Sequence, residues 1–303
     1  MRISPRAYER ITLVAVVMLA AIIVTGAAVR LTGSGLGCPE WPNCDPGSLA
    51  PREATNAHGW VEFVNRVVTA LVSLAVIVSV LGSLLRHPRR RDLVWLSVGL
   101  VVGVFAQAVL GGLVVKFGLE PPFVMAHFLV SIVLLADAVV LADRARRPPG
   151  RARPVVDRVV VVLSKLVLVA AVGVLVAGTV VTATGPHGGD EEAERFGFSL
   201  PHVTRIHGLA VLVFLALLVT IFYVLDRRGA PDEVRRRLAA VLVVSLAQAA
   251  VGYVQYFNDI PEVLVGVHIA GATAVSALTL WFYLGLFAVE TSVADRAPAA
   301  AIA

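Results

Sequence analysis

The chain has few charged residues for its length. Only 16% of its 303 residues are Asp, Glu, Lys or Arg, whereas a soluble domain would carry roughly a quarter. With 58% hydrophobic residues and a mean hydropathy of +0.84, it has too little polar surface for a water-soluble fold. The net charge of +5 would suit a nucleic-acid partner, but the basic residues lie in short clusters between long apolar runs. Composition therefore predicts an integral membrane protein in a lipid bilayer, with no nucleic acid as partner.

The apolar runs are long enough to cross a membrane as helices. About 20 apolar residues span a hydrocarbon core of roughly 30 Å, and in lipid the backbone must bond within its own helix. We predict an all-α fold of eight transmembrane helices, at 11–30, 61–85, 93–115, 123–142, 158–183, 203–225, 237–256 and 263–288. The first run is too long for the apolar part of a cleaved signal peptide, so we expect it to remain as a helix.

Lysine and arginine are nearly absent from every second loop. The arginine-rich segments are the N-terminus and residues 86–91, 144–158 and 227–237. The alternate loops are 31–59, 116–122, 184–202 and 257–262. Because basic residues mark the inner side, both termini are expected in the cytoplasm, with the protein in the plasma membrane. The Ala-rich tail from Ala294 is expected to be disordered.

The second half of the chain repeats the first. The pattern Gln-Ala-x-x-Gly occurs at 107–111 and at 248–252, and a histidine follows each glutamine after twenty residues, at His127 and His268. Four identities at one offset, in matching predicted helices, indicate an internal repeat.

A weaker repeat links the first and fifth predicted helices. Residues 24–33 and 176–185 share Val, Gly, Val, Thr and Gly at the same spacing. We therefore predict two pseudo-symmetric four-helix bundles. They form an N-terminal half at 1–145, a cytoplasmic linker at 146–157 and a C-terminal half at 158–303.

Three histidines are predicted to lie about one turn inside the membrane, on its outer side. They are His127, His207 and His268. A single histidine there would more often be a hydrogen-bonded helix-end residue, but three at matched depth favour a functional site. His87 and His187 fall in loops, where we expect them to be solvated and without a role.

The histidine spacing favours haem over zinc. No His-x-x-x-His pair or close Cys/His cluster is present. Haem iron instead takes axial imidazoles from separate helices, and His207 and His268 suit such a bis-histidine site in the second half. In the first half, Asn65 falls where the second half has His207. An iron held by His127 alone would keep a position open for oxygen, so the first half is the candidate reactive site.

A carboxylate, Glu62, lies three residues before Asn65 in the same predicted helix. His58, Glu62 and Asn65 share one helix face. Glu62 is expected to be an acid/base or positioning group, with a structural Glu62–Arg66 ion pair as the alternative.

The chain has only two cysteines. Cys38 and Cys44 lie in an outer loop and do not form Cys-x-x-Cys-His, which excludes c-type haem attachment. An oxidising outer compartment favours a disulfide between them. Trp41, between the two cysteines, is expected to anchor this loop at the membrane interface.

Together these motifs resemble one bacterial family. The sequence VRLTGSGL-x-CP-x-WP-x-C at 29–44, then Glu62-x-x-Asn65-Arg66, then the paired histidines, is similar to the heme A synthase family over nearly the whole chain. Many members have histidine where this chain has Asn65, so here either His58, two turns earlier, or no residue takes the place of that ligand.

The resemblance implies an oxidoreductase. It would convert the C8 methyl group of heme O to a formyl group by successive hydroxylations, supplying heme A to cytochrome oxidase. His207 and His268 would hold a resident heme b. His127 would bind the substrate haem, beside Asn65 and Arg66, with Glu62 as catalytic carboxylate. A heme O synthase and an electron donor would be the expected partners.

Two other functions compete with this one. A diheme b-type electron carrier linked to quinol would explain the histidines but leave Glu62 and the cysteines without a role. A transporter is less favoured, because the repeat is parallel rather than inverted. Three arginines near the outer surface could bind haem propionates or, equally, lipid phosphates: Arg30, Arg66 and Arg205.

Overall fold

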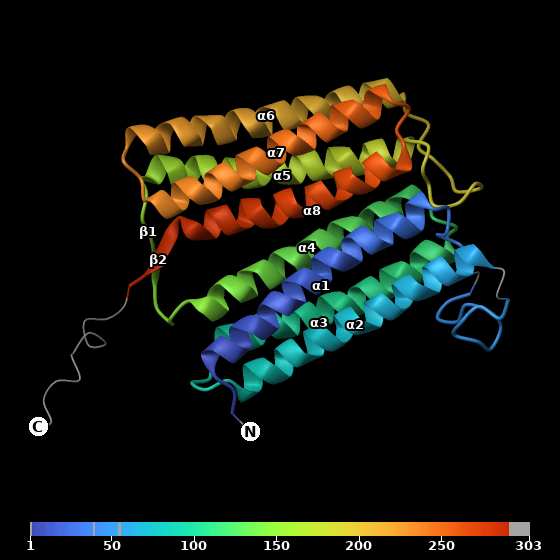
Figure 1. Ribbon diagram of the computed structural model, residues 1–303, viewed down its shortest axis with the longest axis horizontal. Helices are drawn as coiled ribbons and strands as arrows, with labels where there is room; N and C mark the ends of the chain where they lie inside the picture. The colour runs from blue at the N-terminus through green and yellow to red at the C-terminus, as the bar shows by residue number, and fades with distance from the viewer. Residues whose placement is uncertain (1, 39, 54–55, 291–303) are drawn as a thin grey trace, which may run out of the picture.

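The structure, a computed structural model, describes residues 2–38, 40–53 and 56–290. The tail from Ala294 lies outside the described residues. The helices are α1 (Pro5–Leu31), α2 (Ala57–Leu85), α3 (Arg91–Lys116), α4 (Pro121–Arg146), α5 (Arg158–Thr184), α6 (Leu200–Arg227), α7 (Asp232–Phe257) and α8 (Glu262–Gly285) (Figure 1). Two short strands, β1 (Ala152–Pro154) and β2 (Phe287–Val289), form an antiparallel pair. The predicted all-α membrane fold is confirmed.

Each of the eight helices, 24 to 29 residues long, has the length and apolar composition needed to cross a membrane. Several extend beyond the predicted spans: α1 begins at Pro5 rather than residue 11, and α7 at Asp232 rather than residue 237. The first turns of these helices are charged, so apolar length alone does not predict them, although they continue the helix. At α1, the Ser4 side chain caps the start of the helix by accepting a hydrogen bond from the Ala7 N–H (3.2 Å). The last span was predicted too long, since α8 ends at Gly285 and Phe287 belongs to β2.

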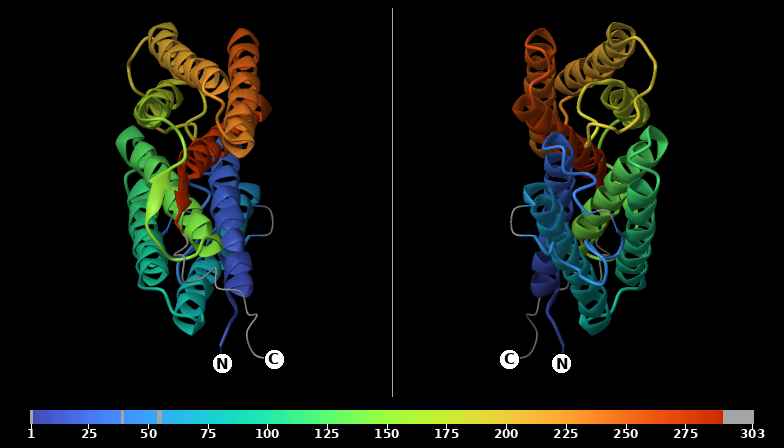
Figure 2. Two further views of the ribbon diagram at one scale, coloured as in Figure 1. Left: turned by 90° about the vertical axis from the view of Figure 1, so that its left-hand side faces the viewer. Right: turned by 90° about the vertical axis from the view of Figure 1, so that its right-hand side faces the viewer.

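The helices form two groups that meet along α8. Helices α1 to α4 lie on one side of α8 and α5 to α7 on the other (Figures 1 and 2). Helix α8 packs against α1 and α4 as well as against α5 and α7. Its residues Ile269, Ala277 and Trp281 pack against the core of the first group, while Phe282 belongs to the core of the second. The two groups are thus joined by shared packing and not only by the chain.

The arginine-rich end of the bundle is tied together by backbone contacts. Strand β1, after α4, pairs with β2, after α8, with Arg153 opposite Ala288. Arg147, at the end of α4, donates hydrogen bonds to the carbonyls of Leu284 (2.9 Å) and Phe287. The segment between the halves is therefore held against the end of α8.

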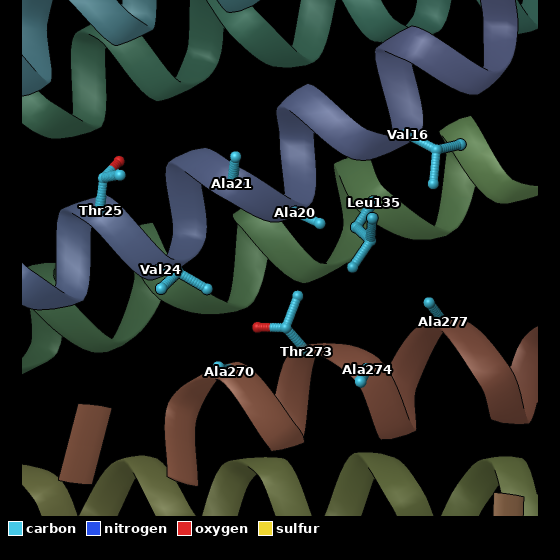
Figure 3. A pocket seen from close by; sticks show the side chains of 10 residues that line it. All are labelled: Val16, Ala20, Ala21, Val24, Thr25, Leu135, Ala270, Thr273, Ala274 and Ala277. Carbon is cyan, nitrogen blue, oxygen red and sulfur yellow. The ribbon is translucent and has the colours of Figure 1, made fainter. Parts of the chain in front are cut away.

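A pocket of about 430 Å³ lies between α1, α4 and α8 (Figure 3). The pocket exists because small side chains line it, among them Ala20 and Ala21 on α1 and Ala270 and Ala274 on α8. Its lining contains no titratable residue. It is therefore distinct from the histidine sites described below.

The orientation predicted from the arginines can be tested by labelling. Leu49, in the loop between α1 and α2, and Val155, directly after β1, are both exposed. That loop and β1 lie at opposite ends of the bundle (Figure 1). A membrane-impermeant maleimide applied to intact cells is expected to label Leu49→Cys, and to label Val155→Cys only after permeabilisation. The native cysteines are disulfide-bonded and serve as the unlabelled background. Labelling of Val155→Cys in intact cells would reverse the predicted orientation.

Candidate functional site

The sequence repeat is also a repeat of hydrogen bonds. Gln107 Nε2 on α3 donates to the backbone carbonyl of His127 on α4 (2.9 Å), and Gln248 Nε2 on α7 donates to that of His268 on α8 (2.5 Å). In each half, one glutamine therefore ties the neighbouring helix at its histidine. Sequence analysis found this motif but assigned the glutamine no role.

The turns before the two histidines share an unusual backbone. Gly118 and Leu119 have φ of 58° and 64°, and Asp259 and Ile260, 141 residues later, have φ of 58° and 56°. Left-handed backbone is uncommon for Leu and Ile, so its recurrence at the same offset places His127 and His268 equivalently. Each lies six residues after the start of its helix, about 9 Å along the axis.

A glycine on a neighbouring helix faces each histidine ring. A Cβ built on Gly178 would lie 3.1 Å from His207 Cε1, and one on Gly252 would lie 3.1 Å from His268 Cε1. On Gly111 it would lie 3.5 Å from His127 Cε1. An added Cβ would press on the ring at Gly178 and at Gly252 but would make an ordinary contact at Gly111, so in the second half the glycines let the imidazoles pack closely against helix backbone.

The second-half histidines lie at a separation that fits one metal ion. The ring centroids of His207 and His268 are 6.4 Å apart, with the planes at 73°. Two imidazoles with metal–nitrogen bonds of about 2 Å would have centroids roughly 6 Å apart. The His207 Nδ1 bonds to the carbonyl of Val174 (3.1 Å), which requires a proton on Nδ1 and leaves the Nε2 lone pair free for a ligand bond. The pair therefore fits the predicted bis-histidine haem site.

The first half has open space where the second half has a ring. Gly26 on α1 corresponds to Gly178, yet no described atom lies within 4 Å of the position of its Cβ. Among the described residues, His127 Nδ1 and Asn65 Oδ1 are buried without a hydrogen-bond partner. They are two of twelve such atoms, and His268 Nδ1 is another, so each half has an unpaired nitrogen on its α4 or α8 histidine.

Glu62 is buried at the end of the bundle that carries the cysteines. Its exposure is 6%, and both carboxylate oxygens are bonded: Oε2 accepts from the backbone N–H of Cys38 (2.8 Å), and Oε1 accepts from Arg66 Nη2 (2.5 Å) and Nε (3.1 Å). The ion pair considered from the sequence is therefore present. The bond from Cys38 could not be read from the sequence, because it depends on how the loop folds onto α2.

We call residues 32–56 the cysteine loop. The predicted disulfide between Cys38 and Cys44 is confirmed, with an S–S distance of 2.07 Å. Gly37 lies directly on the first turn of α2, where a Cβ would come within 2.4 Å of the His58 backbone carbonyl. Trp41 reaches α3, with its ring 3.1 Å from the position of a Cβ on Gly112. The loop therefore covers the ends of both α2 and α3.

Two other histidines considered from the sequence, His58 and His187, also make hydrogen bonds. His58 is exposed at the start of α2, and its Nδ1 bonds to Ser34 Oγ (2.9 Å). The prediction that His187 is solvated is wrong: its side chain is 18% exposed, and its Nε2 bonds to the carbonyl of Ile260 (2.7 Å). The cause is the left-handed α7–α8 turn, which points that carbonyl at the ring.

The three arginines proposed for propionates differ in their partners. Arg30 Nη2 donates to the carbonyl of Thr182 (2.8 Å) near the end of α5, so it bridges the two halves. Arg66 is bonded to Glu62 and to the cysteine loop. Arg205 is exposed and has no hydrogen-bond or ion-pair partner among the described residues.

These features define a class of protein: a multi-pass membrane protein of repeated helices with a pair of histidines in one half and a single histidine beside open space in the other. Residues 9–187 match the COX15-CtaA family model, described as cytochrome oxidase assembly protein. The chain belongs to this family.

Several curated proteins are similar to part of the chain. A heme A synthase of Geobacillus kaustophilus is 34% identical over 137 residues, covering 43% of this chain and 41% of that protein. Heme A synthases of Lysinibacillus sphaericus and Listeria welshimeri are 34% identical over 130 residues and 30% identical over 128 residues, covering 42% of this chain in each case. These matches cover 41% and 42% of those two proteins, so the similarity spans about two fifths of the length of these relatives.

The close contact at Gly37 can be tested by substitution. Gly37→Ala places a methyl group against the backbone of α2, which cannot move aside, so the cysteine loop must lift away. We expect the free energy of unfolding to fall by about 1–3 kcal/mol, seen as a Tm lower by a few degrees in detergent. Gly197→Ala, where no described atom lies within 4 Å of the added Cβ, is the control. Equal Tm values for the two variants would contradict the described docking.

Proposed function

We propose that the protein is a heme A synthase that oxidises the C8 methyl group of heme O to a formyl group, for assembly of cytochrome oxidase. The observation that carries this proposal is the difference between its two halves. One half brings two histidines to the spacing of two ligands on a single metal ion, whereas the other has one histidine, His127, and open space at Gly26. Membership of a cytochrome oxidase assembly family supports the same assignment.

In this proposal the second half, residues 158–303, holds a resident heme b through His207 and His268. A haem with two histidine ligands supplies one-electron transfer and has no position for another ligand. Gly178 and Gly252 leave room for the rings, and Gln248 fixes the backbone at His268. Arg205 and Arg30 are the arginines with donors left for a propionate: among the described residues Arg30 makes one hydrogen bond, through Nη2, and has an unpartnered Nε, whereas the donors of Arg66 are bonded within the protein.

The first half, residues 1–145, binds heme O as substrate, and residues 146–157 link the halves. His127 is its ligand, while the space beside Gly26 and Asn65 leaves the opposite side free for oxidation. Glu62 is the catalytic carboxylate, which holds or moves a proton beside the reacting methyl group. A heme O synthase would supply the substrate, a separate donor would supply electrons, and the sites would face the outer side of the plasma membrane.

Mass analysis of extracted haem tests the reaction itself. Membranes that contain this chain and a heme O source are expected to yield heme A or its hydroxylated intermediate. Glu62→Ala should lower this yield by at least about 100-fold, because an acid/base group typically contributes that much. Glu53→Ala, an exposed carboxylate of the cysteine loop, is the control. If the native chain yields only unmodified heme O and heme b while an oxidase control is active, a diheme electron carrier becomes the better assignment.

The open position in the first half can be closed by mutation. Asn65→His supplies the ring that the second half has, and Gly26 leaves room for it. EPR of the haem-loaded variant is expected to show a second low-spin bis-histidine signal. Asn258→His, at an exposed asparagine after α7, should leave the EPR spectrum unchanged. A low-spin bis-histidine signal from both halves of the native chain would refute a single-histidine site.

A further inference from the structure

We propose that Arg66 is a positioning residue, not a propionate ligand: it clamps the cysteine loop over the first-half site and holds Glu62 in one orientation. The effect on catalysis rests on the proposed function, because Glu62 is catalytic only in that proposal. The clamp itself stands on hydrogen bonds within the chain and can be tested without haem.

All five N–H groups of Arg66 are bonded within the protein. Nε and Nη2 donate to Glu62 Oε1 (3.1 and 2.5 Å), and the second Nη2 proton reaches the carbonyl of Glu40 (3.2 Å). Nη1 donates to the carbonyls of Pro42 (2.9 Å) and Asn43 (2.8 Å). A guanidinium has five donors, so none is left for a propionate unless the loop is released.

The carboxylate is fixed from its other side by the same loop. The backbone N–H of Cys38 donates to Glu62 Oε2 (2.8 Å), and the disulfide joins Cys38 to Cys44, which directly follows the carbonyls held by Arg66. The loop, the arginine and the carboxylate thus form one closed set of contacts. Freeing Glu62 to turn requires breaking contacts at both ends of the disulfide-bonded segment.

The clamped segment also packs on α3, the helix next to His127. Trp41, between the two cysteines, contacts Gly112 of α3, and the adjacent Gly111 faces the ring of His127. Arg66 therefore holds the loop that carries Trp41 against the helix that packs on His127. Arg205, by contrast, is exposed and has no partner among the described residues, so its donors are available to an anionic ligand.

The first test measures how readily the disulfide is reduced. Purified protein in detergent, without added haem, is treated with dithiothreitol, and the exposed thiols are tagged with a maleimide polymer. Arg66→Ala should raise the rate of reduction at least about tenfold, because the loop opens more often. Arg66→Lys should give an intermediate rate, since an ammonium has three donors and no planar fork.

The control for this test is Arg52, an arginine of the cysteine loop itself. Arg52 Nη2 donates to the carbonyl of Pro46 (2.6 Å), and among the described residues Arg52 has no hydrogen bond or ion pair with α2. Arg52→Ala should leave the rate of reduction within about twofold of the native value. If Arg66→Ala is no faster than Arg52→Ala, the clamp does not exist and the proposal is overturned.

The second test separates positioning from haem binding. In membranes with a heme O source, Arg66→Ala should keep its bound heme O but convert much less of it, with partial recovery in Arg66→Lys. Loss of bound heme O with a folded chain would instead make Arg66 a propionate ligand and overturn the proposal. If the native chain forms no heme A while Arg66→Ala still speeds reduction, the clamp stands and the proposed function fails.

Discussion

A polar side chain inside a bilayer has no water to bond, and this constraint governs the whole structure. The backbone responds by forming helices throughout the membrane. Buried polar side chains respond by bonding to nearby carbonyls, as Gln107 and Gln248 do to the helices that carry the histidines. His127 Nδ1 and Asn65 Oδ1 are two of twelve buried side-chain atoms that have no hydrogen-bond partner among the described residues, and His268 Nδ1 is another. Unpaired polarity in lipid is costly, and both halves carry this cost at a histidine ring.

The two halves share one backbone scaffold but differ in the residues around their histidines. The turns before His127 and His268 have the same left-handed backbone, and the same glutamine bond holds each histidine's helix. The halves differ at the glycine of their first helix: Gly178 packs against the ring of His207, whereas a Cβ on Gly26 would have no neighbour within 4 Å among the described residues. In the proposed alignment of the halves, Asn65 takes the place of His207.

Much of the fold follows from composition and periodicity, whereas the site depends on backbone placement. Eight helices and the repeat could be predicted because apolar length and motif spacing are properties of the sequence alone. The disulfide could be predicted because only Cys38 and Cys44 are available. The hydrogen bond from Cys38 to Glu62 and the carbonyls around Arg66 could not be predicted. They depend on the path of the loop backbone, which the order of side chains in the sequence does not indicate. His187 was mispredicted for the same reason.

The cysteine loop also joins the halves, which bears on how two haem sites could work together. Gly35 of this loop donates to the carbonyl of Gly189 in the α5–α6 loop (2.8 Å), and Leu119 packs against both glycines. Nearby, Arg30 of α1 holds the end of α5 at Thr182. Together with the packing of α8 against α1 and α4, these contacts fix one half against the other at the histidine level. In the proposed function, electrons would pass between haems held by the two halves, and the cysteine loop would help to keep their separation fixed.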